Sequence, residues 1–324
     1  MTHDFRLMTT LSIIGTGKIV GEVLDMLRQE RLPLKVSSLY AHRNMERARQ
    51  LAHTYDIDKI YTDYDELLLH DTSDIIYIAN VNDQHFPFAR KALQAGRNVI
   101  IEKPICLKAE DLDTLIALAR DSHLYIFEAM TVRFMPNFIR LKDDVQKLGR
   151  ISIVEANYSQ YSSRYDQYKQ GIVLPAFDPA HAGGALLDLN IYNITVVVSL
   201  FGPPERKQYY PNRGFNGVDT SGIMLLRYPH FTAACTAAKD ADGDSHITIE
   251  GENGYIRVNG VPSMCQEYEL HLRGAQPVVV REQSPAGRLS YEFRRFIDIF
   301  ERRDYAAMTT LMAQSRAAIE SYTM

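Results

Sequence analysis

The tripeptide Glu102-Lys103-Pro104 places an amine where a small molecule could reach it. It follows residues 98–101, NVII, which have the composition of a buried strand. Because proline disfavours the helical conformation of the residue before it, we expect Lys103 to be extended at the carboxyl end of that strand. In doubly wound sheets, ligands gather at those ends. Lys103 can therefore hold a hydroxyl or shift the pKa of a neighbour, although a surface lysine that caps a loop would show the same pattern.

A carboxylate and a phenol are paired within residues 181–192, HAGGALLDLNIY. The two glycines Gly183 and Gly184 open a predicted helix, in which Asp188 and Tyr192 are four residues apart and share one face. Leucine and isoleucine surround Asp188, and a carboxylate in apolar surroundings needs a partner. The pair can act on a substrate, and the alternative is a helix with one hydrogen-bonded Asp and a packing Tyr.

A glycine turn near the N-terminus has the context of a dinucleotide-binding fingerprint. The sequence GTGKI, residues 15–19, follows an apolar run and precedes a helical pattern. Gly15 would permit the tight turn, and Gly17 would let a pyrophosphate approach the helix N-terminus. Val20 stands where the third glycine of GxGxxG is expected, a place that mainly serves packing. The pattern favours nucleotide binding over a glycine turn without a ligand.

The end of the second predicted strand bears on which dinucleotide binds. NAD sites usually carry an acid there, which binds the ribose 2′-hydroxyl. Residues 31–45 contain no Asp or Glu, and the strand is followed by His42 and Arg43. An arginine can pair with a 2′-phosphate through planar, charge-assisted hydrogen bonds, and His42 adds a donor. We therefore expect NADP rather than NAD; the alternative is an NAD site with a merely solvated Arg43.

Strands and helices alternate regularly over the first 125 residues. Apolar runs predict the strands, and apolar positions at helical spacing predict the helices between them. The strands are expected at 11–14, 34–40, 75–79, 98–101 and 124–127, and the helices at 18–31, 45–55, 85–95 and 108–122. This alternation predicts an α/β fold, with a dinucleotide-binding Rossmann domain over residues 1–125 that contains a doubly wound parallel sheet.

The pattern changes in residues 126–324, where strands follow one another. Helices are expected at 136–148, 185–200, 289–302 and 308–321, and strands at 151–158, 220–227, 231–238, 246–250, 254–258, 268–272 and 278–281. Strands in series predict an α+β domain with a large, mostly antiparallel open sheet, which would bind substrate. One face of this sheet has no obvious helical cover, so we expect a homodimer or a higher homo-oligomer through it.

Composition and charge exclude several classes of function. The 324 residues suggest about two domains, and 36 basic against 40 acidic residues give a net charge of −4. No block of like charge suggests a nucleic-acid or membrane-surface partner, and no apolar run approaches the ~18 residues of a membrane span. The N-terminus has no apolar secretory segment, the three cysteines are far apart, and the histidines lack metal-ligand spacing. We expect a cytoplasmic protein that binds no nucleic acid, membrane or metal.

Several motifs, taken in their order, resemble the Gfo/Idh/MocA family of NAD(P)-dependent oxidoreductases. They are the GxG turn, EKP after a strand and GGALLDLNIY, together with segments 82–85, 93–96, 128–134 and 249–254. The resemblance covers nearly the whole chain. Tyr192 stands where many members carry His, which is similar to the branch of dihydrodiol dehydrogenase, NADP-dependent xylose dehydrogenase and glucose–fructose oxidoreductase. Asn80-Val81 departs from the Thr-Pro of many members.

The resemblance implies roles for these residues. Lys103 would contact the substrate hydroxyl and the nicotinamide ribose, Tyr192 would transfer the proton, and Asp188 would orient the substrate or Lys103. Glu102 and Pro104 would shape the nicotinamide pocket, through a cis Lys–Pro bond that only proline makes accessible. The residues expected at the cofactor are Gly15, Thr16, Gly17, Lys18, Ile19, His42, Arg43, Asn80, Asn82, His85, Glu102, Lys103 and Pro104.

Oxidation of an alcohol sends a hydride to nicotinamide C4 and removes a proton from oxygen. A phenol with a pKa of about 10 is a poor base at neutral pH, but an ammonium about 4 Å away, at an effective dielectric constant near 20, attracts the phenolate by about 4 kcal/mol. A shift of up to ~3 pK units would bring Tyr192 into the range of a general base. We therefore expect Lys103 and Tyr192 to converge on one alcohol.

A tyrosine-rich stretch within residues 158–168 leaves the substrate open. Its aromatic rings would suit a sugar or an aromatic diol, a dimer interface or a solvated loop. Arg133 is expected to face the same cleft and to contact substrate. A small sugar, polyol or cyclic diol is the expected class, because one Lys and one Tyr bind hydroxyls rather than fix a carboxylate.

A non-catalytic NAD(P)-binding sensor of the same fold is the other candidate function. The intact set of Lys103, Asp188 and Tyr192 argues against it, because a sensor need not retain all three.

Overall fold

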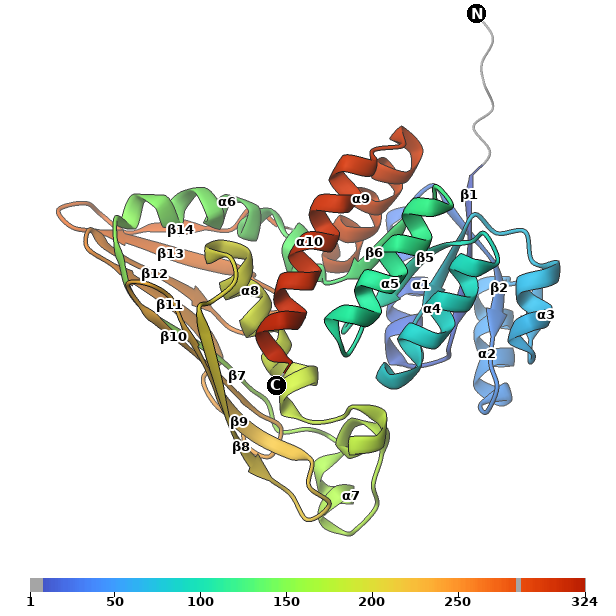
Figure 1. Cartoon of the computed structure of the whole chain (residues 1–324), viewed down its shortest axis with the longest axis horizontal. Helices are drawn as coiled ribbons and strands as arrows, with labels where there is room; N and C mark the ends of the chain where they lie inside the picture. Colours follow the sequence, from blue (N-terminus) through green and yellow to red (C-terminus); the bar gives the residue numbers. More distant parts are fainter. Residues whose placement is uncertain (1–7, 284–286, 324) are drawn as a thin grey trace, which may run out of the picture. The chain divides into compact units, whose positions relative to one another are not determined.

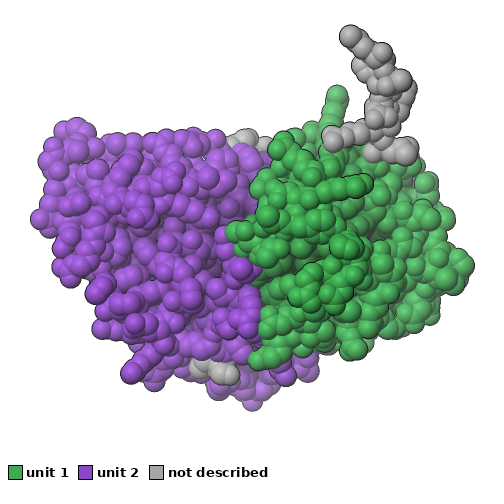
Figure 2. Space-filling model, turned by 45° about the horizontal axis from the view of Figure 1, so that its top comes forward, with its two compact units in different colours: residues 1–106, 110–129, 293–312 green, residues 107–109, 130–292, 313–324 purple. Residues whose placement is uncertain are grey.

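The structure, a computed structural model, describes residues 8–283 and 287–323. The chain forms two compact units: unit 1 contains residues 1–106, 110–129 and 293–312, and unit 2 contains residues 107–109, 130–292 and 313–324 (Figure 2). The division expected from the sequence, 1–125 and 126–324, follows chain order. The observed units instead share the C-terminal helices between them.

Unit 1 is built on a parallel sheet with the strand order β3-β2-β1-β4-β5-β6 (Figure 1). Its elements are β1 Thr9–Ile14, α1 Lys18–Glu30, β2 Leu34–Tyr40, α2 Met45–Tyr55, β3 Lys59–Tyr61, α3 Tyr64–His70, β4 Ile75–Ile78, α4 His85–Gln94, β5 Asn98–Glu102, α5 Ala109–Asp121 and β6 Ile126–Ala129. Strand order reverses between β1 and β4, which is where open α/β sheets bind ligands outside the carboxyl ends. The predicted doubly wound parallel sheet is confirmed.

Two short elements of unit 1 are absent from the sequence prediction. β3 has three residues and α3 has seven. Apolar periodicity needs a longer window to distinguish an element from a loop. β3 forms because it pairs with the end of β2, and this pairing is a tertiary contact that the local pattern does not contain.

The C-terminal helices α9 Arg288–Arg302 and α10 Tyr305–Tyr322 contribute to the core of unit 1. The rings of Phe293 and Phe296 are fully buried. Phe296 stacks on Phe127 of β6 with ring centroids 4.8 Å apart, and Phe293 meets the edge of Tyr77 of β4 at 5.6 Å. The apolar side of α9 thus covers the strands of the first sheet, which explains why a segment late in the chain belongs to unit 1.

Unit 2 contains an eight-stranded sheet in the order β14-β13-β12-β11-β7-β10-β9-β8. The strands are β7 Ile151–Ser159, β8 Arg206–Arg213, β9 Asp219–Arg227, β10 Thr232–Ala238, β11 His246–Gly251, β12 Gly254–Asn259, β13 Glu267–Leu272 and β14 Val278–Val280. Neighbours pair antiparallel except β7 and β10, which are parallel. The predicted mostly antiparallel sheet is confirmed.

The strand β8 is the one strand of this sheet that the sequence prediction lacks. Its residues RKQYYPNR are polar and contain Pro211, which cannot donate a ladder hydrogen bond. Both features are tolerated because β8 lies at the edge of the sheet and pairs with β9 alone.

One face of the large sheet is packed by helices α6 Pro136–Val145 and α8 Ile191–Phe201 (Figure 1). Among the described residues, the helical stretch Pro179–Phe201 is long and apolar enough to cross a bilayer, and 61% of its most apolar window is buried inside the fold. Packing against the sheet accounts for its apolar character.

The helix predicted over residues 185–200 is divided in two. Residues Leu186–Asn190 form a π-helical turn, and α8 begins at Ile191. A π-helical turn inserts one extra residue per turn and is frequent at functional sites. Asp188 lies within this turn and Tyr192 follows it, so the simple four-residue helical spacing between them does not hold.

Candidate active site

The glycine turn of unit 1 has one glycine fixed by close packing and one beside open space. Gly15 has a φ of +116°, and a Cβ there would lie 2.5 Å from the carbonyl oxygen of Ala79, so that only glycine fits. Gly17 precedes α1, and no protein atom lies within 4 Å of the place its Cβ would take. The first turn of α1 carries no acid. Open space at such a helix N-terminus suits a phosphate group.

Asn80, directly beyond β4, borders the same turn. Its backbone nitrogen lies 3.3 Å from the place of a Cβ on Gly15. Its side-chain Oδ1 is buried and accepts no hydrogen bond from any described residue. A buried acceptor without a donor costs about 1–3 kcal/mol, which a bound ligand would recover. The open space at Gly17 and this acceptor fit a dinucleotide cofactor. Thr16 and Ile19 are half-buried beside the turn, Lys18 is exposed, and Asn82 begins the short helical turn Asn82–Gln84.

The motif Glu102-Lys103-Pro104 lies at the carboxyl end of β5, as expected. Glu102 accepts a hydrogen bond of 2.5 Å from the hydroxyl of Tyr77. The Lys103–Pro104 peptide bond is cis, in agreement with the resemblance. Just beyond it, the backbone N–H of Ile105 donates to the carboxylate of Glu128 at 3.2 Å. The loop that carries Lys103 is therefore held by carboxylates on β5 and β6.

The buried imidazole of His85 supports this loop from inside the fold. The imidazole is 1% exposed. Its Nδ1 lies 2.8 Å from the carbonyl oxygen of Pro104 and its Nε2 lies 3.2 Å from that of Asn80. The ring thus ties the ends of β4 and β5 together. A neutral imidazole carries one N–H and can donate to only one of these two carbonyl oxygens. These contacts give His85 a supporting role, and its direct contact with a cofactor stays a prediction.

The end of β2 presents two exposed donors. His42 and Arg43 are exposed, and the carboxamide of Asn44 caps α2 by accepting from the N–H of Arg47 at 3.1 Å. Tyr40, the last residue of β2, packs its ring against Tyr64 at 5.6 Å. The two basic side chains therefore stand at the edge of the sheet, next to a helix N-terminus that also favours anions.

In unit 2, both glycines before the π-helical turn are required by neighbouring atoms. A Cβ on Gly183 would lie 2.5 Å from the carbonyl oxygen of Pro175. Gly184 has a φ of +119°, and its Cβ would lie 2.0 Å from Oδ1 of Asp219. The glycine pair that the sequence places at a helix start is thus explained by the approach of two other segments.

Asp219, which sequence reasoning missed, fixes the start of this turn. Its Oδ2 accepts from the N–H of Leu186 at 2.7 Å and from the hydroxyl of Tyr209 at 2.6 Å. Burial raises the pKa of Asp219 above its usual range. The carboxylate satisfies one of the free N–H groups at the start of the helical segment, as a capping residue does.

Asp188 is held by a lysine that sequence reasoning also missed. Lys239 follows β10, its side chain is 2% exposed, and its Nζ lies 2.8 Å from Oδ2 of Asp188. The Asp188 side chain keeps 38% of its surface exposed. The partner that a carboxylate among apolar residues requires is therefore a buried cation. In the sequence, AAKD after a strand has the pattern of a solvated turn, so no local signal identifies Lys239.

Tyr192 packs in a small apolar cluster next to the π-helical turn. Its ring lies 5.9 Å from that of Tyr158, beside Ala185 and Leu189. The ring is half-buried. Asp188 and Tyr192 thus stand close to each other along the chain, the first with an exposed edge and the second against an aromatic neighbour.

The tyrosine-rich stretch is mainly a packed cluster. It contains the short helix α7 Tyr165–Lys169. Tyr168 is 3% exposed and stacks on Phe177 at 4.9 Å and on Phe215 at 4.4 Å. Of the interpretations left open by the sequence, a solvated loop is wrong for Tyr168, because aromatic stacking buries it.

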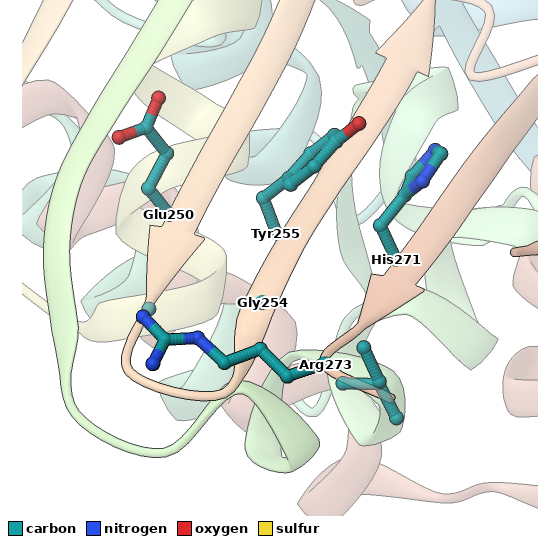
Figure 3. A pocket seen from close by; sticks show the side chains of 7 residues that line it. Glu250, Gly254, Tyr255, His271 and Arg273 are labelled. Atoms are coloured by element: carbon teal, nitrogen blue, oxygen red, sulfur yellow. The ribbon is translucent and has the colours of Figure 1, made fainter. Parts of the chain in front are cut away.

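Arg133 is 5% exposed and donates from Nη1 to the hydroxyl of Ser315 on α10 at 2.7 Å. Arg133 is thus buried and held by α10, and its contact with substrate stays a prediction. A surface hollow of about 370 Å³ lies elsewhere: it is lined by Glu250, Gly251, Gly254, Tyr255, His271, Leu272 and Arg273 (Figure 3). None of the residues predicted for the site lines it.

Comparison with known proteins gives two family matches. Residues 10–129 match the family described as "Oxidoreductase family, NAD-binding Rossmann fold", and residues 141–257 match the "GFO/IDH/MocA C-terminal domain". The chain is 29% identical over 294 residues to the scyllo-inositol 2-dehydrogenase (NADP⁺) IolU of Bacillus subtilis, covering 91% of this chain and 89% of that protein. It is 30% identical over 272 residues to human trans-1,2-dihydrobenzene-1,2-diol dehydrogenase, covering 81% and 77%.

The fold is also shared with a solved structure. KijD10, a 3-ketoreductase from Actinomadura kijaniata in complex with NADP and TDP-benzene, superposes with a TM-score of 0.83 at 19% identity, covering 96% of each chain.

The buried imidazole of His85 makes stability depend on pH. Burial lowers the pKa of His85 below its usual value of 6.5. The unfolded chain then binds more protons than the folded chain below about pH 6.5, so stability falls as pH falls through that value. We expect His85→Gln to flatten this decline, as measured by urea unfolding from pH 8 to pH 5. The exposed His53→Gln is the control, and equal slopes in wild type and His85→Gln would contradict the prediction.

Proposed function

The chain belongs to the Gfo/Idh/MocA family of oxidoreductases, and we propose that it is an NADP-dependent dehydrogenase. Its substrate would be a small sugar, polyol or cyclic diol, oxidised at a hydroxyl-bearing carbon or formed by the reverse reduction. The relatives named for inositol and for a dihydrodiol support this class. The observation that carries the proposal is the Asp188 carboxylate, which is 38% exposed, is held by the buried ammonium of Lys239 and precedes Tyr192 by four residues in the chain.

The dinucleotide would be held by the turn from Gly15 to Ile19 and by the acceptor of Asn80. The amides at the start of α1 would bind its pyrophosphate. When bound, its nicotinamide ring supplies or accepts the hydride. Glu102 and Pro104 would shape the surroundings of that ring, and His85 holds the backbone of Asn80 and Pro104 in place.

The remaining chemistry belongs to the protein's side chains. Tyr192 would take the proton from the reacting hydroxyl during oxidation and return it during reduction. The ammonium of Lys103 would favour the phenolate form and bind the same substrate oxygen. Asp188 would accept a hydrogen bond from a second hydroxyl, which fixes the orientation of the substrate.

The preference for NADP over NAD is proposed on Arg43 and His42. Both are exposed at the end of β2, and residues 31–45 contain no acid that would repel a 2′-phosphate. IolU is named for NADP⁺, which supports the same choice. NAD binding is the alternative.

We also propose a homodimer through the outer face of the large sheet. Cross-strand register places Ile153, Ile223 and Tyr255 on this face, and each is at least 40% exposed. Figure 3 shows Tyr255 and His271 side by side on it, with rings stacked at 4.3 Å. A patch of this composition is typical of an interface.

Charged residues of both signs also lie on this face. Arg206 and Arg227 face each other at the β8–β9 end. Toward β13, Glu267 pairs with Arg281 and Glu269 with His271, and Arg257 lies beside Glu269 in the register. The same patch on both copies is the arrangement of an isologous dimer.

Turnover tests the proposed activity. We expect wild type to reduce NADP⁺ with at least one of scyllo-inositol, trans-1,2-dihydrobenzene-1,2-diol and xylose. Tyr192→Phe and Lys103→Met should each lower kcat by about 100-fold or more, since general acid–base groups contribute roughly 10²–10⁴. NADPH production at 340 nm is the readout, with circular dichroism as the folding control. Near-wild-type turnover in either variant would defeat the assignment.

Arg43→Glu tests the cofactor preference. A carboxylate repels the 2′-phosphate and can bind a 2′-hydroxyl, so the variant should bind NADPH at least about tenfold more weakly, with NADH affinity equal or improved. Fluorescence titration gives both dissociation constants. Unchanged preference in the variant would remove Arg43 from cofactor selection.

Light scattering at micromolar concentration tests the dimer. Wild type should have twice the chain mass of 36.9 kDa. Ile153→Glu, near the centre of the sheet, should give a monomer because it would bury a charge in the interface. Ile139→Glu is the matched control, since Ile139 is 54% exposed on α6 on the other side of the sheet. A monomeric wild type would overturn the proposal.

A further inference from the structure

Lys239 is a buried cation to which the proposed mechanism assigns no task. Its ammonium donates to Oδ2 of Asp188 at 2.8 Å and to the carbonyl oxygen of Ala176 at 2.5 Å. It also lies over the ring of Phe177, 4.5 Å from the centroid. An ammonium has three donors, and here they meet a carboxylate, a carbonyl and an aromatic face. All three partners of the Lys239 ammonium therefore lie inside the protein.

Packing alone does not account for a lysine at this place. Withdrawing an ammonium from water is costly, and buried ion pairs are often no more stabilising than apolar residues of the same volume. The pair is also unequal, because Lys239 is 2% exposed and Asp188 is 38% exposed. The ammonium of Lys239 is thus buried, while the carboxylate of Asp188 reaches the surface. The buried ammonium fixes the orientation of this exposed carboxylate.

Lys239 also joins the segments that surround the π-helical turn. Its backbone N–H donates to Thr220 at 2.8 Å, on the strand that supplies Asp219. The Ala176 carbonyl that it binds also accepts from the N–H of Gly184 at 3.1 Å. The ammonium of Lys239 therefore binds both the loop before the π-helical turn, through the Ala176 carbonyl, and the Asp188 carboxylate within the turn.

We propose that Lys239 is a positioning residue, which holds Asp188 in one rotamer so that its exposed edge can accept a hydrogen bond from a substrate hydroxyl. Because Lys239 is sealed and its donors are engaged, it does not itself bind substrate. The inference rests on the proposed function, in which Asp188 orients the substrate. It adds that orientation depends on a residue about fifty positions later in the chain.

A double-mutant cycle tests the coupling. We prepare Lys239→Met, Asp188→Asn and the double variant, and measure kcat and KM with NADP⁺ and the best of scyllo-inositol, trans-1,2-dihydrobenzene-1,2-diol and xylose. Lys239→Met should lower kcat/KM by about 10- to 100-fold, the range for a hydrogen bond to a charged group, mainly through KM. In the Asp188→Asn background the same change should cost less than about threefold, because Lys239 would act through the carboxylate.

Lys147→Met is the matched control. Lys147 forms an ion pair in unit 2 with the reverse burial: its Nζ lies 2.5 Å from Oδ1 of Asp144, the lysine side chain is 53% exposed and the carboxylate 3%. The variant therefore controls for the loss of a lysine ion pair that lies away from the π-helical turn. Its kinetic constants should match those of wild type. NADPH affinity, measured by fluorescence, should be unchanged in Lys239→Met. A loss of kcat/KM of equal size in both Asp188 backgrounds would show a merely structural role and overturn the proposal.

A crystal structure of Lys239→Met gives a readout that does not depend on turnover. Asp188 should leave its wild-type rotamer or spread over several, and an unchanged rotamer would overturn the proposal. The outcomes distinguish failure of the inference on Lys239 from failure of the proposed function. Turnover by wild type without an effect of Lys239→Met defeats this inference alone, whereas absence of turnover by wild type on all three alcohols defeats the proposed function and the inference with it.

Discussion

Most polar groups that the fold buries find a hydrogen-bond partner, because an unpaired one is costly, and these contacts shape both units. In unit 1, the imidazole of His85 lies between two backbone carbonyls, and Glu102 accepts from the hydroxyl of Tyr77. In unit 2, Asp219 meets a backbone amide and a phenol, and Lys239 meets Asp188. These contacts hold the loops at the strand ends and the start of the π-helical turn. Without them, the same loops would have no fixed geometry.

Two features of the candidate site leave room for a ligand. The Oδ1 of Asn80 accepts no hydrogen bond within the described chain, and it borders the open space at Gly17. Asp188 is paired on one side and exposed on the other. An acceptor without a donor and a carboxylate with an exposed edge are the features that a ligand can complete. They support a dinucleotide in unit 1 and a hydroxyl-bearing molecule in unit 2.

The two faces of the large sheet of unit 2 differ in what covers them. Helices α6 and α8 cover one face, which makes the burial of α8 sufficient to explain its apolar sequence. The other face carries exposed isoleucines and a tyrosine among charged residues of both signs. The alternating pattern of a strand determines which residues share a face of the sheet. It does not determine which molecule covers that face, because this depends on association with another chain.

The sequence by itself determined the two sheets, the glycine turn and the position of the EKP loop at a strand end. These features are local: a period of two or 3.6 residues, a glycine between strand and helix, and a proline after a lysine. Only the tertiary structure decided that Phe293 and Phe296 complete the first core, that β8 is an edge strand, and that Arg133 is buried. It also brought Lys239 to Asp188 and Asp219 to Leu186. The reason is physical: the partner of a buried charge comes from whichever segment packs nearby, and a distance along the chain of 33 or 51 residues leaves no trace in local periodicity.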